Sequence, residues 1–351
     1  MWKSEKKIEI ISDEYSYTSG YFTANKWVDS DTIILGRAKK NENKEMEIVK
    51  YSVSSNEMTV LDDSGSSDWV VFGDKVYSNN GFTISEIDVQ TKEKKIIYTD
   101  EYCTKCKEEG TVKGEVNRMN GVHITGDGKY VSVYVIKQKT SFLRINVATG
   151  ECEEFFTIGF EAPFAVADHL MPCPTNNDLY FFAHEGITFY VSNRLWLYDI
   201  KEKKAWNIAK QRMDSDGNLG DCFGHEMWAK DGKGLYFVKY ICSPLKDKGI
   251  CYADVLTGKS ELCYSGFNYW HVSTSEDRMF LASDTQTGKD YSEVIAIDKS
   301  DNSETLIDEA LTNWTHPCHP HPQYSPDSSK LVYNVLNKKA NTCYVKIALR
   351  S

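Results

Sequence analysis

Three features are scarce in this chain of 351 residues: long apolar runs, prolines and regularly spaced cysteines. No run of 18 apolar residues occurs, which excludes an ordinary membrane-spanning helix. Only 8 prolines are present and 41% of residues are hydrophobic, so a folded globular protein is favoured over a disordered one. Residues 1–15 contain no apolar stretch typical of a secretory signal, so we expect a cytoplasmic protein.

Cysteine spacing and charge exclude further classes. The ten cysteines follow no framework, and Cys103-x-x-Cys106 has no second pair to complete a zinc site, so we expect reduced thiols and a surface loop there. The net charge of -10 argues against nucleic acid or an anionic membrane as partner. A small anionic substrate remains compatible, because a metal and a few cations can reverse the field locally.

A repeated unit runs through the chain, and each copy is a polar turn followed by a short apolar strand. The seven copies begin at Trp27, Val70, Ile124, Pro174, Ala229, Ser273 and Ser325. Their spacing of roughly forty to fifty-five residues is that of a four-stranded propeller blade. Abundant aromatic residues, with 21 Tyr and 15 Phe, are typical of sheet-rich chains.

The repeat predicts an all-β fold, a seven-bladed β-propeller that forms one domain over residues 1–351. The last blade has about three strands of its own, so we expect residues 7–11 to add the fourth and close the ring. A short helix is expected only near residues 308–311.

A histidine-rich segment near the end of the chain contains His316, His319 and His321. The last two are two positions apart, which on an extended strand points both imidazoles to the same side. Neutral imidazole is the commonest metal ligand, so this segment predicts a transition-metal site with open positions. A solvated turn without function is the alternative.

Other histidines occupy the equivalent place in the repeat. His225 and His271 precede the turns of the fifth and sixth copies, as His319 and His321 precede the seventh, and His169 precedes the fourth. The strand before each turn is the innermost of its blade, so we expect these side chains to meet at one mouth of the central channel. A histidine bonded to the backbone is the alternative for any one of them, and the recurrence in successive blades favours a site.

Four motifs carry a family resemblance, and each alone is weak. They are HLMPCPTNNDLYFFAHEGITFYVSNRLW from His169, Gly224-His-Glu-x-Trp228 before an Asp-Gly turn, His271-Val-Ser-Thr-Ser-x-Asp with Ser-Asp284-Thr285, and His319-Pro-His321-Pro-x-x-Ser-Pro-Asp. Together they make at least residues 21–335 resemble the oligogalacturonate lyases, seven-bladed propellers of pectin catabolism.

The resemblance implies a metal site and a base. In that family three histidines and a glutamine bind manganese, and the histidines fall on His271, His319 and His321. The glutamine position is His316 here, so manganese is expected by resemblance, and zinc, nickel or iron are compatible with a fourth imidazole. The proton-abstracting base falls on His225.

The resemblance also implies a substrate-binding region, to which His169, His184 and Glu185 belong. The family tends to have Pro-Trp where this chain has Ile187-Thr188, so the sugar subsites are expected to differ.

Two arginines, a lysine and two tryptophans complete the candidates. Arg194 and Arg212 suit anionic groups, because a guanidinium matches carboxylate geometry. A structural ion pair is an equal alternative for Arg194 and the favoured one for Arg212. Lys26, expected on the inner strand of blade one, is a weaker cation. Trp228 and Trp270 offer faces for sugar stacking, and a core position is expected for at least one.

The chemistry of uronates connects these residues. Elimination across carbons 4 and 5 requires removal of the poorly acidic carbon-5 proton; a metal on the carboxylate stabilises the developing charge, and a histidine can take the proton. The expected function is a metal-dependent lyase that cleaves short oligogalacturonides such as digalacturonate. A non-catalytic sugar-binding or protein-interaction scaffold is the alternative, and metal-dependent hydrolysis or epimerisation is a third. The oligomeric state is not predicted.

Overall fold

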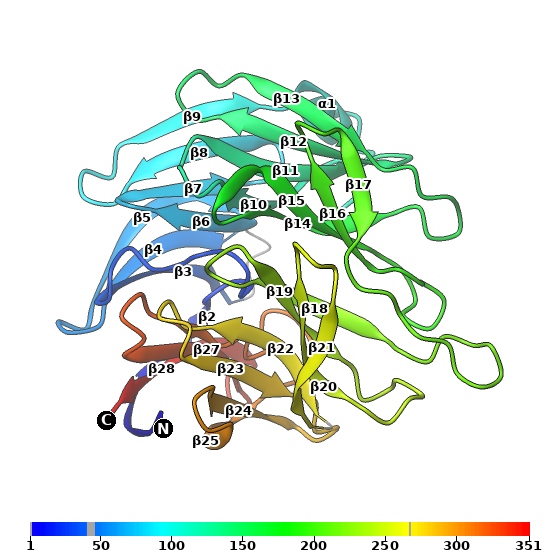
Figure 1. Cartoon of the computed structure of the whole chain (residues 1–351). Helices are drawn as coiled ribbons and strands as arrows, with labels where there is room; N and C mark the ends of the chain where they lie inside the picture. The colour runs from blue at the N-terminus through cyan, green and yellow to red at the C-terminus, as the bar shows by residue number, and fades with distance from the viewer. Residues whose placement is uncertain (1, 41–45, 267) are drawn as a thin grey trace.

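The computed structural model describes residues 2–40, 46–266 and 268–351. Within this part of the chain, the strands form seven four-stranded antiparallel sheets arranged in a ring (Figure 1). The prediction of an all-β seven-bladed propeller is confirmed. That residues 1–351 form one domain stays a prediction.

Blades one to four follow the chain order, from the inner strand outward. Blade one contains β2 (Tyr15–Thr18), β3 (Thr32–Lys39), β4 (Met46–Ser52) and β5 (Glu57–Ser66). Blade two contains β6 (Asp68–Phe72), β7 (Lys75–Asn79), β8 (Thr83–Asp88) and β9 (Lys94–Thr99). Blade three contains β10 (Met119–Ile124), β11 (Tyr130–Ile136), β12 (Thr140–Asn146) and β13 (Cys152–Thr157). Blade four contains β14 (Ala167–Cys173), β15 (Asn176–His184), β16 (Leu195–Asp199) and β17 (Lys204–Asn207).

Blades five to seven complete the ring. Blade five contains β18 (Phe223–Trp228), β19 (Gly234–Lys239), β20 (Gly249–Asp254) and β21 (Ser260–Ser265). Blade six contains β22 (Tyr269–Thr274), β23 (Phe280–Thr285), β24 (Tyr291–Asp298) and β25 (Ser303–Leu311). Blade seven contains β26 (Gln323–Tyr324), β27 (Lys330–Asn337), β28 (Thr342–Arg350) and β1 (Ser4–Ile10).

The N-terminal strand closes the ring, as predicted. β1 runs antiparallel to β28, with Ile8 opposite Ile347, and it begins at Ser4, earlier than expected. Just before it, Trp2 is 1% exposed and its indole Nε1 donates to the carbonyl of Ser328 at 3.0 Å. Both termini therefore contribute to one blade, which lies beside blade one in Figure 1.

Deleting residues 1–12 is expected to lower the free energy of unfolding by at least about 3 kcal/mol, the cost of emptying one large buried aromatic site. The deletion also leaves β28 with an unpaired edge. Chemical denaturation measures the change, and Trp2→Ala alone should reproduce much of it. Lys6→Ala, at an exposed position of β1, is the control. An unchanged unfolding transition after the deletion contradicts this role.

The helix prediction was wrong. Residues 308–311 belong to β25, which pairs with β24. Ile307 and Ala310 are buried against blade seven, so strand pairing and packing determine the structure here and local helix propensity does not. A helix occurs instead at α1 (Glu101–Glu108), capped by the Asp100 carboxylate, which accepts from the backbone of Cys103. Cys103 and Cys106 lie buried on this helix, not on a surface loop. Among the described residues no helix is long and apolar enough to cross a bilayer.

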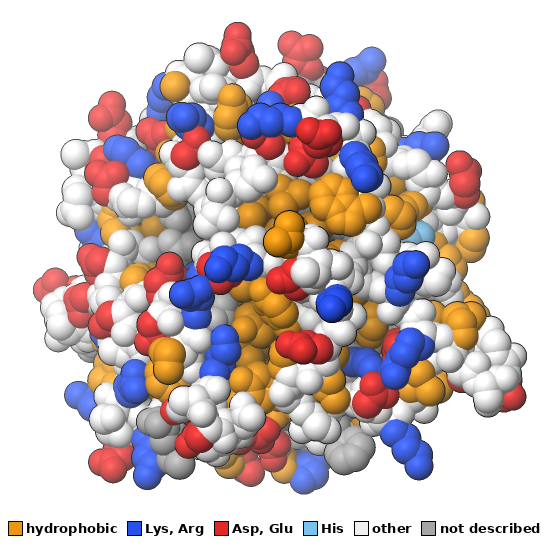
Figure 2. Space-filling view, in the orientation of Figure 1, with side chains coloured by type: hydrophobic (Ala, Val, Ile, Leu, Met, Phe, Trp, Pro, Cys, Tyr) orange, Lys and Arg blue, Asp and Glu red, His pale blue; other side chains and the backbone are white. Residues whose placement is uncertain are grey.

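Charges of both signs are interspersed on the face shown in Figure 2. Surface ion pairs of this kind include Arg144 with Glu153, where Nε lies 2.6 Å from Oε2. That the chain is cytoplasmic and binds neither nucleic acid nor membrane stays a prediction.

Candidate active site

Inner strands are interrupted by β-bulges where the histidines lie. The register shifts between Asp168 and Met171 in β14, between Gly224 and Met227 in β18, and between Tyr269 and Val272 in β22. His169 and His225 sit inside these bulges with φ of 52° and 55°, and His321 before β26 has φ of 47°. Non-glycine residues rarely adopt this left-handed backbone; bulges re-aim side chains, and such outliers gather at functional sites.

The buried side chains of His271, His319 and His321 converge from blades six and seven. Each offers one ring nitrogen, and these nitrogens all lie within 4.8 Å of one another. The His316 ring centre is 4.6 Å from that of His319. Both ring nitrogens of His319, and Nε2 of His321, are buried without a hydrogen-bond partner among the described residues. Burying a nitrogen without a hydrogen bond costs folding free energy. A bound transition metal would supply the missing partner, so these residues fit the expected ion.

Burial favours the neutral form that a metal needs in three of these histidines. Burial, and then the neighbouring histidines, place the pKa of His271 well below its usual value. Burial does the same to the pKa of His321, and it lowers the pKa of His316 to about 4. Imidazoles must be deprotonated to bind a metal, so His271, His316 and His321 are prepared for one at neutral pH.

Asp284 orients two members of the cluster. It is fully buried on β23, and both carboxylate oxygens lie 2.9 Å from Nδ1 of His271. It also accepts from the backbone N–H groups of His271 at 2.7 Å and His321 at 3.2 Å. Because Nδ1 donates to the carboxylate, Nε2 of His271 keeps its lone pair for a metal. The sequence showed Asp284 only as part of a motif, and its role was missed.

Asp284→Asn is expected to weaken metal binding by about 10- to 100-fold, as loss of an outer-shell carboxylate does elsewhere, while the fold is retained. Calorimetric titration of the metal-free protein with Mn²⁺ measures the change. Asp298→Asn, a buried aspartate on β24 of the same blade, is the control. Equal affinity in the wild type and Asp284→Asn contradicts the orienting role.

His225 lies beside the cluster, and its hydrogen bond to the backbone leaves one ring nitrogen free. Its ring centre is 4.0 Å from that of His271, and its Nδ1 donates to the carbonyl of Trp270 at 2.8 Å. A bond to a carbonyl requires the proton on Nδ1, so Nε2 carries a free lone pair. Burial holds the pKa of His225 well below its usual value. The residue is therefore a neutral base next to the cluster.

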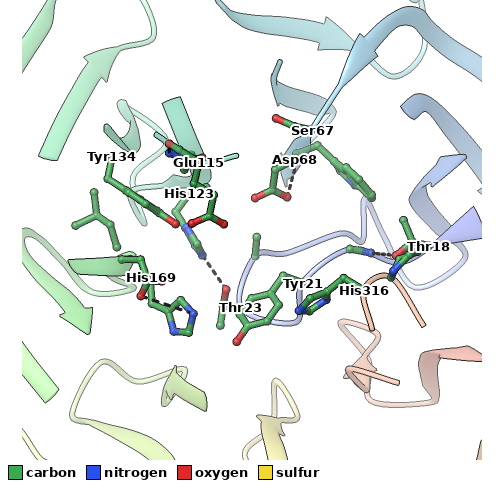
Figure 3. Close-up of a pocket in the computed structure, with 18 of the residues that line it drawn as sticks. Thr18, Tyr21, Thr23, Ser67, Asp68, Glu115, His123, Tyr134, His169 and His316 are labelled. Carbon is green, nitrogen blue, oxygen red and sulfur yellow. Dashed lines mark hydrogen bonds and ion pairs between the residues drawn. The ribbon is translucent and has the colours of Figure 1, made fainter. Parts of the chain in front are cut away.

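The connection between β2 and β3 brings Tyr21 to the histidines, which the sequence did not indicate. Its ring centre is 4.9 Å from that of His321 and 5.4 Å from that of His169. Gln323 donates to the Tyr21 carbonyl at 3.1 Å, and Thr23 is bonded to Nε2 of His123 at 3.1 Å, so blades seven and three hold this connection. Figure 3 shows Tyr21 between His169 and His316.

A cavity of about 650 Å³ opens around Tyr21. Polar side chains from five blades line it, including Thr18, Asp68, Glu115, His123, His169 and His316 (Figure 3). The histidine cluster borders this space through His316 and His321. A small polar molecule can therefore reach the histidines.

An ion-pair network surrounds Arg194, which is 7% exposed. Its guanidinium donates to Glu185 at 3.0 Å and to Glu226 at 3.2 Å, and Nδ1 of His169 lies 3.2 Å from Glu226. Burial works to lower the pKa of His169, but Asp168 and Glu226 outweigh it and raise the pKa to about 9. The structural-pair interpretation of Arg194 thus has direct support, and substrate contact stays a prediction.

Arg212, His184 and Trp270 have distinct surroundings. Arg212 is half exposed and pairs with Asp221 at 2.8 Å and Asp247 at 2.7 Å, which supports the favoured ion-pair interpretation. Nε2 of His184 lies 2.7 Å from the Phe164 carbonyl. Trp270 is partly exposed and stacks on His271 with ring centres 5.2 Å apart. Their substrate or catalytic roles stay predictions.

Lys26 and Trp228 are both buried. Lys26 lies in the connection between β2 and β3, not on an inner strand, and its fully buried ammonium bonds Asp68 and the Trp69 carbonyl. Trp228 is 4% exposed in the core between blades four and five, and its indole donates to the Met171 carbonyl at 3.1 Å. The prediction of an inner-strand position for Lys26 was wrong, and the core position expected for one of the tryptophans is found at Trp228. Sugar contact by either residue stays a prediction, which this burial does not favour.

Comparisons with known proteins agree with the motifs, although no family model matches the sequence. An oligogalacturonide lyase of Pectobacterium atrosepticum is 24% identical over 291 residues, covering 73% of this chain and 70% of that protein. A solved oligogalacturonate lyase in complex with manganese has a TM-score of 0.80 at 16% identity, covering 100% of this chain and 99% of the other. The oligogalacturonate lyase of Vibrio parahaemolyticus has a TM-score of 0.78 at 14% identity, covering 99% and 95%. The predicted resemblance is thus confirmed: this chain is similar in sequence to an oligogalacturonide lyase and shares the fold of two oligogalacturonate lyases.

Proposed function

We propose that this chain is a metal-dependent lyase that cleaves short oligogalacturonides by β-elimination. The observation that carries the proposal is the pairing of two kinds of imidazole. Ring nitrogens of His271, His319 and His321 converge within 4.8 Å, and those of the last two include buried atoms without a partner among the described residues. The neutral ring of His225 lies 4.0 Å from that of His271. The similarity to proteins named oligogalacturonide and oligogalacturonate lyases supports the substrate class.

His271, His316, His319 and His321 would hold the ion. When bound, it supplies Lewis-acid stabilisation of the charge that develops on the substrate carboxylate. Manganese is the metal named for one structural relative, and four imidazoles also suit zinc, nickel or iron. Asp284 fixes the orientation of His271 and of the His321 backbone.

His225 takes the carbon-5 proton on Nε2, because its Nδ1 proton is committed to the Trp270 carbonyl. The carbon–hydrogen electron pair then forms the carbon 4–carbon 5 double bond as the bond to oxygen 4 breaks. Trp270 is partly exposed beside His225 and His271, so it can cover one face of the sugar.

The cavity that His316 and His321 border supports a short substrate. At about 650 Å³ it lies within the range of ligand pockets, roughly 300–1,000 Å³. This suits a substrate of two or three sugars better than a polymer.

The test is an ultraviolet assay for new unsaturation with digalacturonate, trigalacturonate and other uronates, with and without added Mn²⁺. The proposal predicts product from digalacturonate only when metal is present. A tightly bound metal without turnover on any uronate would instead indicate the non-catalytic, sugar-binding alternative. Product mass separates elimination from hydrolysis, because hydrolysis adds one water for each bond cleaved.

A further inference from the structure

His169 and His225 occupy equivalent positions in neighbouring blades but have opposite partners. Both sit in the bulge of an inner strand with nearly the same φ, 52° and 55°. The Nδ1 of His225 donates to a neutral carbonyl, that of Trp270, at 2.8 Å. The Nδ1 of His169 instead faces the carboxylate of Glu226 at 3.2 Å. A carbonyl accepts from a neutral imidazole as well as from an imidazolium, whereas a carboxylate specifically stabilises the imidazolium.

The remaining surroundings of His169 are charged on several sides. Asp168 precedes it on β14, Glu226 comes from β18, and Glu185 and Arg194 follow β15 and precede β16. The Tyr21 ring packs against His169. His169 also interacts electrostatically with four other histidines, His123, His225, His271 and His316. Burial raises the pKa of Asp168 well above its usual range, and the neighbouring His169 and Arg194 oppose that rise. Glu226 faces His169 and favours its protonated form, and Arg194 pairs with both Glu185 and Glu226.

The second nitrogen of His169 is available to a ligand. Its Nε2 lies 3.8 Å from Asp168 Oδ1, which is too long for a hydrogen bond. The residue lines the same cavity as Tyr21 and His316, and Figure 3 shows its ring beside that space. An imidazolium with an uncommitted N–H beside a cavity can donate a proton to a bound molecule.

A metal ion between Asp168, His169 and Glu185 is a competing interpretation, since these residues offer donors within 4.8 Å of one another. The guanidinium of Arg194 already binds both oxygens of Glu185, so a cation there would meet a fixed positive charge. Proton donation uses the same groups without this conflict.

Elimination from a galacturonide needs such a donor. The hydrogen on carbon 5 and oxygen 4 lie on opposite faces of the galacturonate ring, so the residue that removes the proton does not also protonate the leaving oxygen. Two groups with different protonation states, from different strands, fit this requirement.

We propose that His169 is the general acid that protonates oxygen 4 of the leaving sugar, an inference that rests on the proposed lyase function. His225 accepts the carbon-5 proton, the double bond forms, and the carbon 4–oxygen bond breaks with its electron pair on oxygen. Nε2 of His169 supplies the proton to that oxygen. His225 ends protonated and His169 neutral, and one proton exchanged through solvent restores both.

The experiment compares two substrates with different leaving groups. Digalacturonate leaves through a sugar oxygen that needs a proton, whereas methyl 4-deoxy-4-fluorogalactosiduronate leaves as fluoride, which needs none. His169→Asn, which tolerates the left-handed backbone, should lower kcat by about 10²- to 10⁴-fold on digalacturonate and by only a few fold on the fluoride. His225→Asn, at the matched position of blade five, should lose both activities.

Equal losses of the two activities in His169→Asn would overturn the acid role and leave a binding or structural one. A second readout uses Glu226→Gln on digalacturonate. Removing this carboxylate lowers the pKa of His169, so the alkaline limb of the pH–rate profile should move to lower pH, and an unmoved limb also overturns the proposal. Wild-type protein that turns over neither substrate contradicts the lyase proposal itself.

Discussion

His225→Ala is expected to lower kcat on digalacturonate by about 10²- to 10⁴-fold, the contribution of a positioned general base. The hydrogen bond to the Trp270 carbonyl fixes the tautomer of His225 and leaves a free lone pair on its Nε2. The His225 ring lies next to that of His271. Initial rates of unsaturated product formation measure the effect at saturating metal.

The control for His225→Ala is metal content, because His225 is not among the three converging ligands. Metal stoichiometry should stay as in the wild type, and so should the midpoint of thermal unfolding. An active His225→Ala protein would assign the base to another residue. Loss of the metal together with activity would make His225 a ligand and not the base.

The double variant His319→Ala/His321→Ala is expected to lose stoichiometric metal and all measurable lyase activity. Two of the three converging nitrogens are then missing, and the remaining His271 and His316 do not make a three-ligand site. Elemental analysis of purified protein gives the stoichiometry, and the ultraviolet assay gives the activity.

The matched control for the double variant is the wild type treated with a chelator. It should lose activity in the same way and regain it on addition of Mn²⁺, whereas the double variant should not recover. Full activity in metal-free wild type, or in the double variant, contradicts the metal requirement.

The sequence repeat predicted the features of the fold that recur at a fixed spacing along the chain. Polar turns at blade spacing located the blades, and the short last copy implied that an N-terminal strand, now seen as β1, pairs with β28. The same periodicity explains why His271, His319 and His321 meet although they come from two blades. Periodicity places residues on inner strands, like His271, or just before one, like His319 and His321, and this brings the cluster together.

Periodicity does not predict what one irregular loop or one bulge does. Tyr21 reaches the site through a connection held by Gln323 and His123, two contacts across blades that no local pattern encodes. Lys26 and Trp228 looked available because their type suits a sugar, but bonds and packing between blades bury them.

An anomalous difference map from crystals of the protein soaked in Mn²⁺ would locate the ion directly. One strong peak is predicted within bonding distance of His271, His319 and His321, with Nε2 of His225 unbonded beside it. A map without a peak there, or with its peak between Asp168, His169 and Glu185, would contradict the account.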